Sequence, residues 1–333
     1  MRIATYNIEW FTNLFDDRGQ LLADGAWSAR YNVTRQMQAD GVAHVLGAMD
    51  ADVVMVIEAP DAHRRRSARV ALETFAETFG LRTRKALLGF ENDTQQEIAL
   101  LYDPDALEAR HDPTEEGGPR FDGEFSIDLD IDARPDGVRW SKPPLELACR
   151  SAAGKAFRMI GVHAKSKAPH GAKGREEILA ASIANRRKQL AQCIWLRRRI
   201  DAHLDTGDPM LVLGDFNDGP GLDEYEELFG RSGVEIVLGE GDRERLVEPH
   251  AAMALQRKLG AAPTSARFYI ADQKRWLEVL LDYIMVSQDL APAPRAWRIW
   301  HPFDDPECYD DTNLRAALLA ASDHFPVSID IDL

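Results

Sequence analysis

The segment Leu211-Val212-Leu213-Gly214-Asp215-Phe216-Asn217 is a short apolar run that ends abruptly in polar side chains. Three consecutive aliphatic residues followed by a glycine are typical of a buried strand. Asp215 and Asn217 would then lie at the end of that strand, where a sheet can hold functional groups in fixed positions. A Gly-Asp pair is also common in plain turns, so the segment alone leaves both interpretations open.

The same arrangement of an apolar run beside a polar residue recurs along the whole chain. Short runs at residues 3–6, 53–57, 98–102, 157–162, 211–213, 281–286 and 327–331 predict buried strands. The polar residues at or near their ends are Asn7, Glu58, His163, Asp215, Asn217, Asp282, Asp323 and His324. Each one taken singly could be a turn, a cap or a solvated strand end. The functional interpretation therefore depends on their joint occurrence in this order.

Apolar residues at helical spacing predict helices between these strands. One stripe, in a segment that ends near Asp50, consists of Val42, Val45, Leu46 and Met49. A second stripe, in a long segment that ends near His203, consists of Leu179, Ile183, Leu190 and Ile194. Because strands and helices alternate throughout, the sequence predicts an α/β or α+β protein.

Two segments have less regular patterns. Residues 103–150 are rich in Pro, Gly and Asp and predict hairpins and loops, and residues 218–276 predict a surface excursion with short helices. Neither segment resembles a linker, and no internal repeat is evident. We therefore expect a single domain over residues 1–333, with loop insertions near 103–150 and 218–276.

Composition limits the classes of function. Of the 333 residues 45% are hydrophobic and 29% are charged, which suits a globular core. The chain has 40 basic and 55 acidic residues, for a net charge of −15. Pure nucleic-acid-binding modules are usually basic. The charge thus counts against tight, salt-driven binding of DNA but not against catalysis, since acidic residues can surround a metal ion.

Cysteine spacing and hydropathy favour a cytoplasmic protein. Cys149, Cys193 and Cys308 are far apart and predict reduced, buried thiols rather than disulfides or a zinc site. No apolar run approaches the roughly 20 residues needed to span a bilayer, and no apolar hairpin suited to membrane docking is evident. We expect a soluble cytoplasmic protein with no membrane contact and no obligate protein partner.

Taken together, the polar motifs resemble those of the endonuclease/exonuclease/phosphatase superfamily, which has the deoxyribonuclease-I-like fold. The matching pieces are Thr5-Tyr6-Asn7, Glu58, His163, Gly214-Asp215-Phe216-Asn217, Asp282-Tyr283-Ile284 and Ser322-Asp323-His324. They extend from the first predicted strand to the last, and Gly-Asp-Phe-Asn followed by Ser-Asp-His is specific in combination. The resemblance implies a four-layer sandwich, in which two packed mixed β-sheets are flanked by helices and the site lies at one edge.

The resemblance also implies a metal site. Glu58 and Asp323 would be direct carboxylate ligands, and Asn7 would be a neutral oxygen ligand or a residue that positions the ligands. Mg²⁺ or Mn²⁺ is the expected cofactor, because hard cations prefer oxygen ligands.

The remaining residues receive catalytic roles by the same resemblance. Asp215 would orient or deprotonate the attacking water, and Asn217 would bond to a phosphate oxygen or to Asp215. His324 would donate to the phosphate while Asp282 fixes its tautomer. His163 would be a second phosphate donor or the acid that protonates the leaving group.

The sequence departs from the superfamily pattern in places. Many relatives have Gln before the metal-site Glu, where this chain has Ile57. Several carry Arg-Gly after an Asn-Asp pair, whereas Thr94-Gln95-Gln96 follow Asn92-Asp93 here, so a substrate contact there is missing or changed. Glu97 is a candidate partner of His163.

Basic residues suggest a polyanionic substrate. His163-Ala164-Lys165-Ser166-Lys167 resembles a His-x-Lys-Ser-Lys segment of bacterial relatives, and Lys165 and Lys167 are candidate substrate contacts. Arg186, Arg187 and Lys188 lie on the helix that follows. Arg197, Arg198 and Arg199 suit a solvated face and a substrate-binding face equally well.

Three hypotheses of function follow. The first is a metal-dependent phosphodiesterase that cleaves nucleic acid by activated water. The second is a phosphomonoesterase or a lipid or inositol phosphoesterase of the same superfamily. The third is an inactive binding module, which is disfavoured because every core catalytic position is filled.

Overall fold

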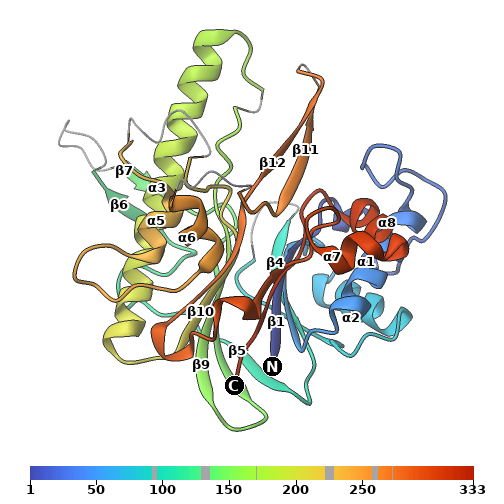
Figure 1. The fold of residues 1–333 in the computed structure, drawn as a ribbon, viewed down its shortest axis with the longest axis horizontal. Helices are drawn as coiled ribbons and strands as arrows, with labels where there is room; N and C mark the ends of the chain where they lie inside the picture. Colours follow the sequence, from blue (N-terminus) through green and yellow to red (C-terminus); the bar gives the residue numbers. More distant parts are fainter. Residues whose placement is uncertain (92–95, 129–135, 170, 222–228, 257–261, 272) are drawn as a thin grey trace.

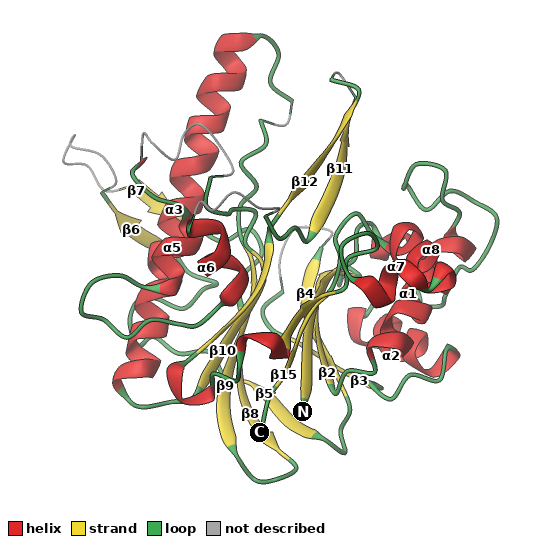
Figure 2. Ribbon diagram, in the orientation of Figure 1, coloured by secondary structure: helices red, strands yellow, loops and turns green. Residues whose placement is uncertain are grey.

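Two β-sheets pack face to face in the computed structural model, and helices cover both outer faces (Figures 1 and 2). The structure describes residues 1–91, 96–128, 136–169, 171–221, 229–256, 262–271 and 273–333. This is the four-layer arrangement of two mixed sheets and flanking helices that the sequence predicted. Within the described part of the chain, no helix has both the length and the apolar character needed to cross a membrane.

The first sheet has six strands and contains the N-terminus. In spatial order they are β14 (Trp297–Ile299), β15 (Val327–Asp330), β1 (Arg2–Asn7), β2 (Val53–Ala59), β4 (Glu97–Tyr102) and β3 (Lys85–Leu88). Only the β1–β2 pairing is parallel. The helices on its outer side are α1 (Arg35–Met49), α2 (Ala68–Thr78), α7 (Pro306–Asp310) and α8 (Thr312–Ala321).

The second sheet has five strands and supplies the other half of the site. In spatial order they are β13 (Asp282–Val286), β10 (Met210–Asp215), β9 (Ala156–His163), β8 (Leu145–Ser151) and β5 (Leu107–His111). Here β9 and β10 are parallel. The outer side is covered by α3 (Arg175–Asp205), α5 (Gly233–Leu238) and α6 (Pro249–Leu255). Two antiparallel pairs stand outside the main sheets: β6 (Phe125–Ile127) with β7 (Asp136–Val138) lies beside α3, and β11 (Ala266–Ile270) with β12 (Arg275–Val279) extends beyond the end of the sandwich (Figure 1).

Both faces of the central strands are buried. Leu211 and Leu213 of β10 join the core between the two sheets, and Met210 and Val212 join the core beneath α3. Successive side chains of a strand point to opposite faces, so a strand covered on both sides must be apolar at every position. This requirement explains why the sequence shows continuous apolar runs, and the structure confirms strands at all of the predicted positions.

The predicted helices are confirmed, and the second predicted stripe is confirmed only in its latter half, where Leu190 is buried and Ile194 packs against the core. The α1 stripe is buried as expected. On α3, Leu179 is 44% exposed and Ile183 is only half-buried. The first turns of α3 extend beyond the end of the sandwich, where no layer covers them (Figure 1). Further along the helix, the buried face includes polar residues such as Arg186 and Gln189, because α3 crosses loops whose carbonyl groups need donors.

The two irregular segments contribute more to the fold than the sequence suggested. Within or at the end of residues 103–150, β6 and β7 form an antiparallel pair, whereas β5 and β8 are strands of the second sheet. Leu145, Leu147 and Cys149 of β8 enter the core between the sheets. Within residues 218–276, α5 and α6 are the expected short helices, and their apolar side chains cover the second sheet. The β11–β12 hairpin of this segment was not predicted.

Gly214 allows β9 and β10 to pair closely just before the end of the strand. Its φ is +141°, and a Cβ there would lie 2.0 Å from the carbonyl oxygen of Val162. Gly214→Ala should therefore lower the free energy of unfolding by about 2–3 kcal/mol, as measured by urea denaturation. The control is Gly207→Ala, which shares a positive φ (+75°) but has open space around the added carbon and should lose only about 1 kcal/mol. Equal losses would show that the clash is relieved without strain.

Candidate active site

The predicted site residues converge because both sheets direct strand ends to the same end of the sandwich. β1 and β2 are parallel, which brings Asn7 beside Ile57 and Glu58. β9 and β10 are parallel, with His163 paired to Asp215. Asp215 is also paired to Asp282, the first residue of β13. Carboxyl ends of parallel strands share one sheet edge, so side chains distant in sequence meet here.

A pocket of about 700 Å³ lies at this edge. The predicted residues in its wall are Asn7, Glu58, His163, Lys165, Asp215, Asn217, Asp323 and His324. Asp282 lies behind His324 and is fully buried. The pocket is further bounded by Phe268, Ile270 and Leu277 of the β11–β12 hairpin. That hairpin and the first half of α3 both extend beyond this end of the sandwich (Figures 1 and 2).

Two of the predicted site residues have left-handed backbone conformations. Glu58 has φ 61° and Asn217 has φ 50°. Glu58 lies at a bulge, where the β2–β4 register shifts between Ile57 and Ala59. Such conformations are unfavourable for residues with a Cβ and persist only where the surroundings fix them. The bulge re-aims the Glu58 side chain into the pocket, a common use of bulges near active sites.

Asp215 is held by three donated hydrogen bonds. The backbone N–H of Asn217 donates to Oδ1 (2.7 Å), and Asn7 Nδ2 and Asn217 Nδ2 both donate to Oδ2 (3.0 and 3.1 Å). Burial raises the pKa of Asp215 to about 6, against the opposing effect of the nearby His324 charge and of these hydrogen bonds. A carboxylate with a pKa close to neutrality and a fixed orientation is well suited to accept a proton from water.

His324 forms a buried pair with Asp282. Nδ1 of His324 lies 2.8 Å from Asp282 Oδ2, which also accepts a hydrogen bond from Ser265 Oγ (2.8 Å). Burial alone would lower the pKa of His324, but the carboxylates of Asp282 and Asp215, with a further contribution from Asp323, hold it well above its usual value. These carboxylates favour the protonated imidazole, whose Nε2–H would be a charged donor at the pocket.

Asp215, Asp282 and His324 bring potential ligand atoms within 4.8 Å of one another. A protonated imidazole cannot coordinate a metal ion, and its Nδ1 already bonds to Asp282. This trio is therefore better suited to acid–base chemistry than to metal binding.

Asn7, Glu58 and Asp323 fit a divalent cation better. Asn7 is 2% exposed, and its Oδ1 has no hydrogen-bond partner among the described residues, although its Nδ2 is bonded. Burial raises the pKa of Glu58 to about 7, with Asp215 and Asp323 adding to the rise against Lys142 and His324. A buried amide oxygen without a donor beside mutually repelling carboxylates matches the ligand chemistry of Mg²⁺ or Mn²⁺.

Lys142 is a residue of the site that the sequence did not reveal. Its Nζ lies 3.1 and 3.3 Å from Nδ1 and Nε2 of His163, and it donates to Gln96 Oε1. Burial lowers the pKa of Lys142, and the carboxylates of Glu58 and Asp215 oppose that effect. Lys142 stands in a loop just before β8, in the sequence Ser141-Lys142-Pro143-Pro144, which carries no strand-end signal.

His163 is neutral in this environment. Burial lowers its pKa well below the usual value, and the charges of Lys142 and His324 lower it further. Its Nε2 lies 3.7 Å from Asp215 Oδ2, but a neutral imidazole forms no ion pair there. This favours the hydrogen-bonding role predicted for His163 over the role of leaving-group acid. Residues 92–95, where the sequence departs from the superfamily pattern, lie outside the described residues.

The two predicted substrate lysines are placed differently. Lys165 lines the pocket, but Lys167 does not. Lys167 Nζ instead donates to Asp218 Oδ1 (2.6 Å), which also pairs with the fully buried Arg186 (2.7 Å). Lys167 is thus engaged with Asp218 rather than with the pocket, because a buried carboxylate next to Asn217 requires cationic partners.

Two of the three consecutive arginines on α3 have structural roles. Arg197 donates to the carbonyl oxygens of Val237 and Leu238, and Arg199 pairs with the buried Glu146. Only Arg198 is exposed.

The His324–Asp282 pair allows a test by double substitution. His324→Ala should lower kcat on a small phosphodiester by about 10²–10³-fold, the usual effect of losing one charged donor. Asp282→Asn should also lower kcat, and the double variant should be no slower than His324→Ala, because Asp282 acts through His324. The measurement is kcat for all four proteins after circular dichroism has confirmed folding. Additive losses in the double variant would show that Asp282 has an independent role.

Comparisons with known proteins agree with this geometry. The family model described as "Endonuclease/Exonuclease/phosphatase family" matches residues 4–324. TDP2 from C. elegans superposes with a TM-score of 0.52 at 13% identity, over 100% of this chain and 75% of that one. A truncated C. elegans TDP2 superposes with a TM-score of 0.51 at 13% identity, over 100% of this chain and 97% of that one. An endonuclease/exonuclease/phosphatase from Bacteroides vulgatus superposes with a TM-score of 0.49 at 16% identity, over 100% of this chain and 98% of that one.

No curated protein matches the sequence significantly. At 13% identity the two TDP2 structures, with TM-scores above 0.5, show a shared fold alone. The family match is broader, because it extends from Ala4 in β1 to His324 and includes each of the motifs gathered at the pocket. The chain therefore belongs to the endonuclease/exonuclease/phosphatase family, as a phosphoesterase with the two-sheet fold of that family.

Proposed function

We propose that this protein is a metal-dependent phosphodiesterase that cleaves nucleic acid with an activated water. The observation that carries the proposal is the pairing, in one pocket, of a fixed carboxylate and a charged imidazole. Asp215 is held by Asn7 and Asn217, and His324 is held by Asp282. Hydrolysis of a phosphodiester needs both a proton acceptor for water and a donor for the negative phosphate oxygens.

The residues of the chain account for the individual steps. A bound Mg²⁺ would be held by Asn7, Glu58 and Asp323, and it would neutralise phosphate charge and make water more acidic. Asp215 accepts the proton of the attacking water while Asn217 fixes its carboxylate. The protonated His324 donates to a phosphate oxygen as negative charge develops there. The P–O bond to the leaving group then breaks, and the departing oxygen takes up a proton from solvent water.

The walls of the pocket favour a nucleotide substrate. Lys142 and Lys165 place positive charge on one side, which suits phosphates that flank the scissile one. Phe268, Ile270 and Leu277 form an apolar wall on the hairpin side, against which a planar base can pack. We also propose that residues 1–333 form one domain, since the site takes residues from β1 to the segment before β15. A cytoplasmic location stays a prediction.

A lipid phosphoesterase is the second candidate, because the β11–β12 hairpin carries exposed aromatic residues that the sequence analysis did not single out. Tyr269 and Trp276 on the outer face of the β11–β12 hairpin are 54% and 51% exposed. Exposed aromatic residues of this kind suit a membrane interface. However, the guanidinium of Arg267 lies 3.9 Å from the centre of the Trp276 ring, and two further basic residues, Lys274 and Arg275, lie at the start of β12. Nucleic acid therefore remains the first proposal.

An assay panel tests these proposals. The purified protein with Mg²⁺ or Mn²⁺ would be incubated with plasmid DNA, single-stranded DNA, RNA, a chromogenic phosphodiester, inositol phosphates and phospholipid vesicles. We expect cleavage of nucleic acid and of the chromogenic diester. Turnover of inositol phosphates alone, or of vesicle lipids alone, would contradict the nuclease proposal and favour the corresponding alternative.

Lys165→Ala tests whether the lysine in the pocket wall binds the flanking phosphates of a nucleic acid. Its loss should raise the KM for single-stranded DNA by about tenfold at 0.1 M salt and reduce the logarithmic salt slope by about one unit. Hydrolysis of the chromogenic diester should hardly change, because that substrate has no flanking phosphates. The exposed Lys85 in β3, outside the pocket, gives the control Lys85→Ala. Parallel losses on both substrates would place Lys165 at the reacting phosphate instead.

A further inference from the structure

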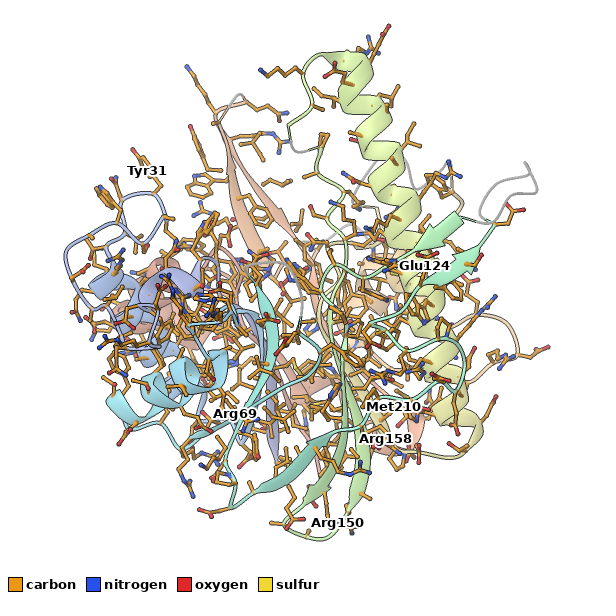
Figure 3. The ribbon with its side chains drawn as sticks, turned by 180° about the vertical axis from the view of Figure 1, so that it is seen from behind. Tyr31, Arg69, Glu124, Arg150, Arg158 and Met210 are labelled. Carbon is orange, nitrogen blue, oxygen red and sulfur yellow. The ribbon has the colours of Figure 1, made fainter. Side chains whose placement is uncertain are left out.

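A second groove lies beside the catalytic pocket, between the β6–β7 hairpin and α3. Its volume is about 460 Å³, and its lining includes Arg139 just after β7 and Lys188 on α3. Glu124, labelled in Figure 3, lies on its rim at the start of the hairpin. This groove is distinct from the catalytic pocket, since the two share no lining residue.

Two glutamines of α3 bring the basic residues of both cavities together. Gln192 Oε1 accepts from the backbone N–H of Lys165 (2.9 Å), and Gln192 Nε2 donates to the carbonyl oxygen of Arg139 (3.3 Å). Gln189, adjacent to Lys188, donates to the carbonyl oxygen of Lys165 (3.0 Å). Residues at i and i+4 of a helix lie on the same face, so Lys188 and Gln192 are neighbours. Lys165 and Arg139 are thus tethered beside Lys188.

These cations are close enough to influence one another. Burial lowers the pKa of Lys165, and the charge of Lys188 lowers it further. The charge of Lys165 in turn adds to the effect of burial in lowering the pKa of Lys142. Among the residues that the structure describes, neither Lys165 nor Lys188 forms an ion pair with a carboxylate. Several neighbouring cations that repel one another, in a protein that is acidic overall, indicate a surface that binds an anion.

We propose that Lys142, Lys165, Lys188 and Arg139 form a cationic track that carries the phosphate backbone of a nucleic acid strand out of the catalytic pocket. The strand crosses Lys165 and enters the second groove, where Lys188 and Arg139 contact phosphates beyond the scissile one. Arg139 pairs with Glu124 in the free protein, but the side chain of Arg139 is 69% exposed and that of Glu124 is 50% exposed. Such a surface pair is weak and can open for a phosphate. The track rests on the proposed nuclease function and gives the direction in which the substrate leaves.

Substitution of the two distal residues tests the track. The double variant Lys188→Ala/Arg139→Ala leaves the catalytic pocket intact. Its affinity for a fluorescent 20-nucleotide single-stranded DNA should fall by about 10- to 100-fold at 0.1 M salt, and the logarithmic salt slope should fall by about two units. The kcat on a chromogenic phosphodiester should be unchanged. Cleavage of a dinucleotide should also be unaffected, because it is too short to reach the groove.

The control removes the same charge from a surface pocket between α3 and the loop that follows α5. Arg198 and Arg243 line a separate surface pocket, and Arg198→Ala/Arg243→Ala should leave the affinity and the salt slope within twofold of wild type. Equal losses in both double variants would overturn the track, since they would report only net charge. Unchanged DNA affinity in Lys188→Ala/Arg139→Ala would overturn it as well.

The binding measurement separates failure of the track from failure of the proposed function. If wild-type protein binds the oligonucleotide through Lys188 and Arg139 but cleaves none, the track stands and the nuclease proposal fails. If it cleaves nucleic acid but the variant binds it normally, the nuclease proposal stands and the track fails. If wild-type protein binds no oligonucleotide at all, the track is wrong.

Discussion

Excess EDTA is expected to reduce hydrolysis of a phosphodiester by this protein to the uncatalysed background, and added Mg²⁺ or Mn²⁺ to restore it. The reason is the arrangement of Asn7, Glu58 and Asp323, which combines an amide oxygen without a donor and crowded carboxylates. A divalent ion at such a site stabilises the transition state by several kcal/mol, which corresponds to a rate factor of about 10³ or more. The measurement is initial rate against free metal concentration.

A substitution distinguishes this site from other sources of metal dependence. Glu58→Gln keeps the size of the side chain but removes a charged ligand, so half-maximal activity should require about 10- to 100-fold more Mg²⁺. Glu91→Gln, an exposed carboxylate outside the pocket, is the matched control and should not change the metal requirement. Full turnover in EDTA, with metal content verified as nil, would remove the central claim about the chemistry.

Asp215→Asn should lower kcat by about 10⁴-fold, at the upper end of the range for loss of a general base. The side chain is 1% exposed and accepts three hydrogen bonds, so the amide would occupy the same space but could not take a proton from water. Because Asn217 Nδ2 and Asn7 Nδ2 would still find an oxygen acceptor, binding of substrate should change little. The measurement is kcat and KM on the chromogenic phosphodiester.

The control for this substitution is Asp289→Asn. Asp289 is exposed and lies after β13, outside the pocket wall, so the variant should keep wild-type kcat. A variant Asp215→Asn that retains near-wild-type turnover would show that another group accepts the proton. Loss of kcat together with loss of folded structure, seen by circular dichroism, would instead assign Asp215 a role in stability.

The positioning of Asp215 also shows how the site tolerates strain. Asn217 keeps a left-handed conformation while its backbone N–H and side chain both bond to Asp215. Gln189 of α3 donates to the carbonyl oxygens of Phe216 and Asn217 from the other side. The turn after β10 is therefore fixed by a buried helix face, which explains why α3 buries polar residues there.

The local sequence was sufficient to predict the strands and the family. Strands covered on both faces must be apolar at each position, so residues 211–213 and 53–57 could be recognised without a partner. A polar residue at the end of such a run lies where the sheet fixes its position, and the joint occurrence of Asn7, Glu58 and Asp215 at such ends made them candidates. Parallel pairing then brings these ends together, as the structure shows for β1 with β2 and for β9 with β10.

Tertiary structure alone decided the partners of these residues. Lys142 reaches His163 from a proline-containing loop, and Lys167 turns away from the pocket toward Asp218. The polar face of α3 likewise depends on loops that are distant in sequence. The burial of a strand can be predicted from the apolar residues of that strand, whereas the pairing of two charged side chains depends on which parts of the chain pack against each other. Those contacts are determined by the packing of the whole chain, so they cannot be predicted from a short stretch of sequence.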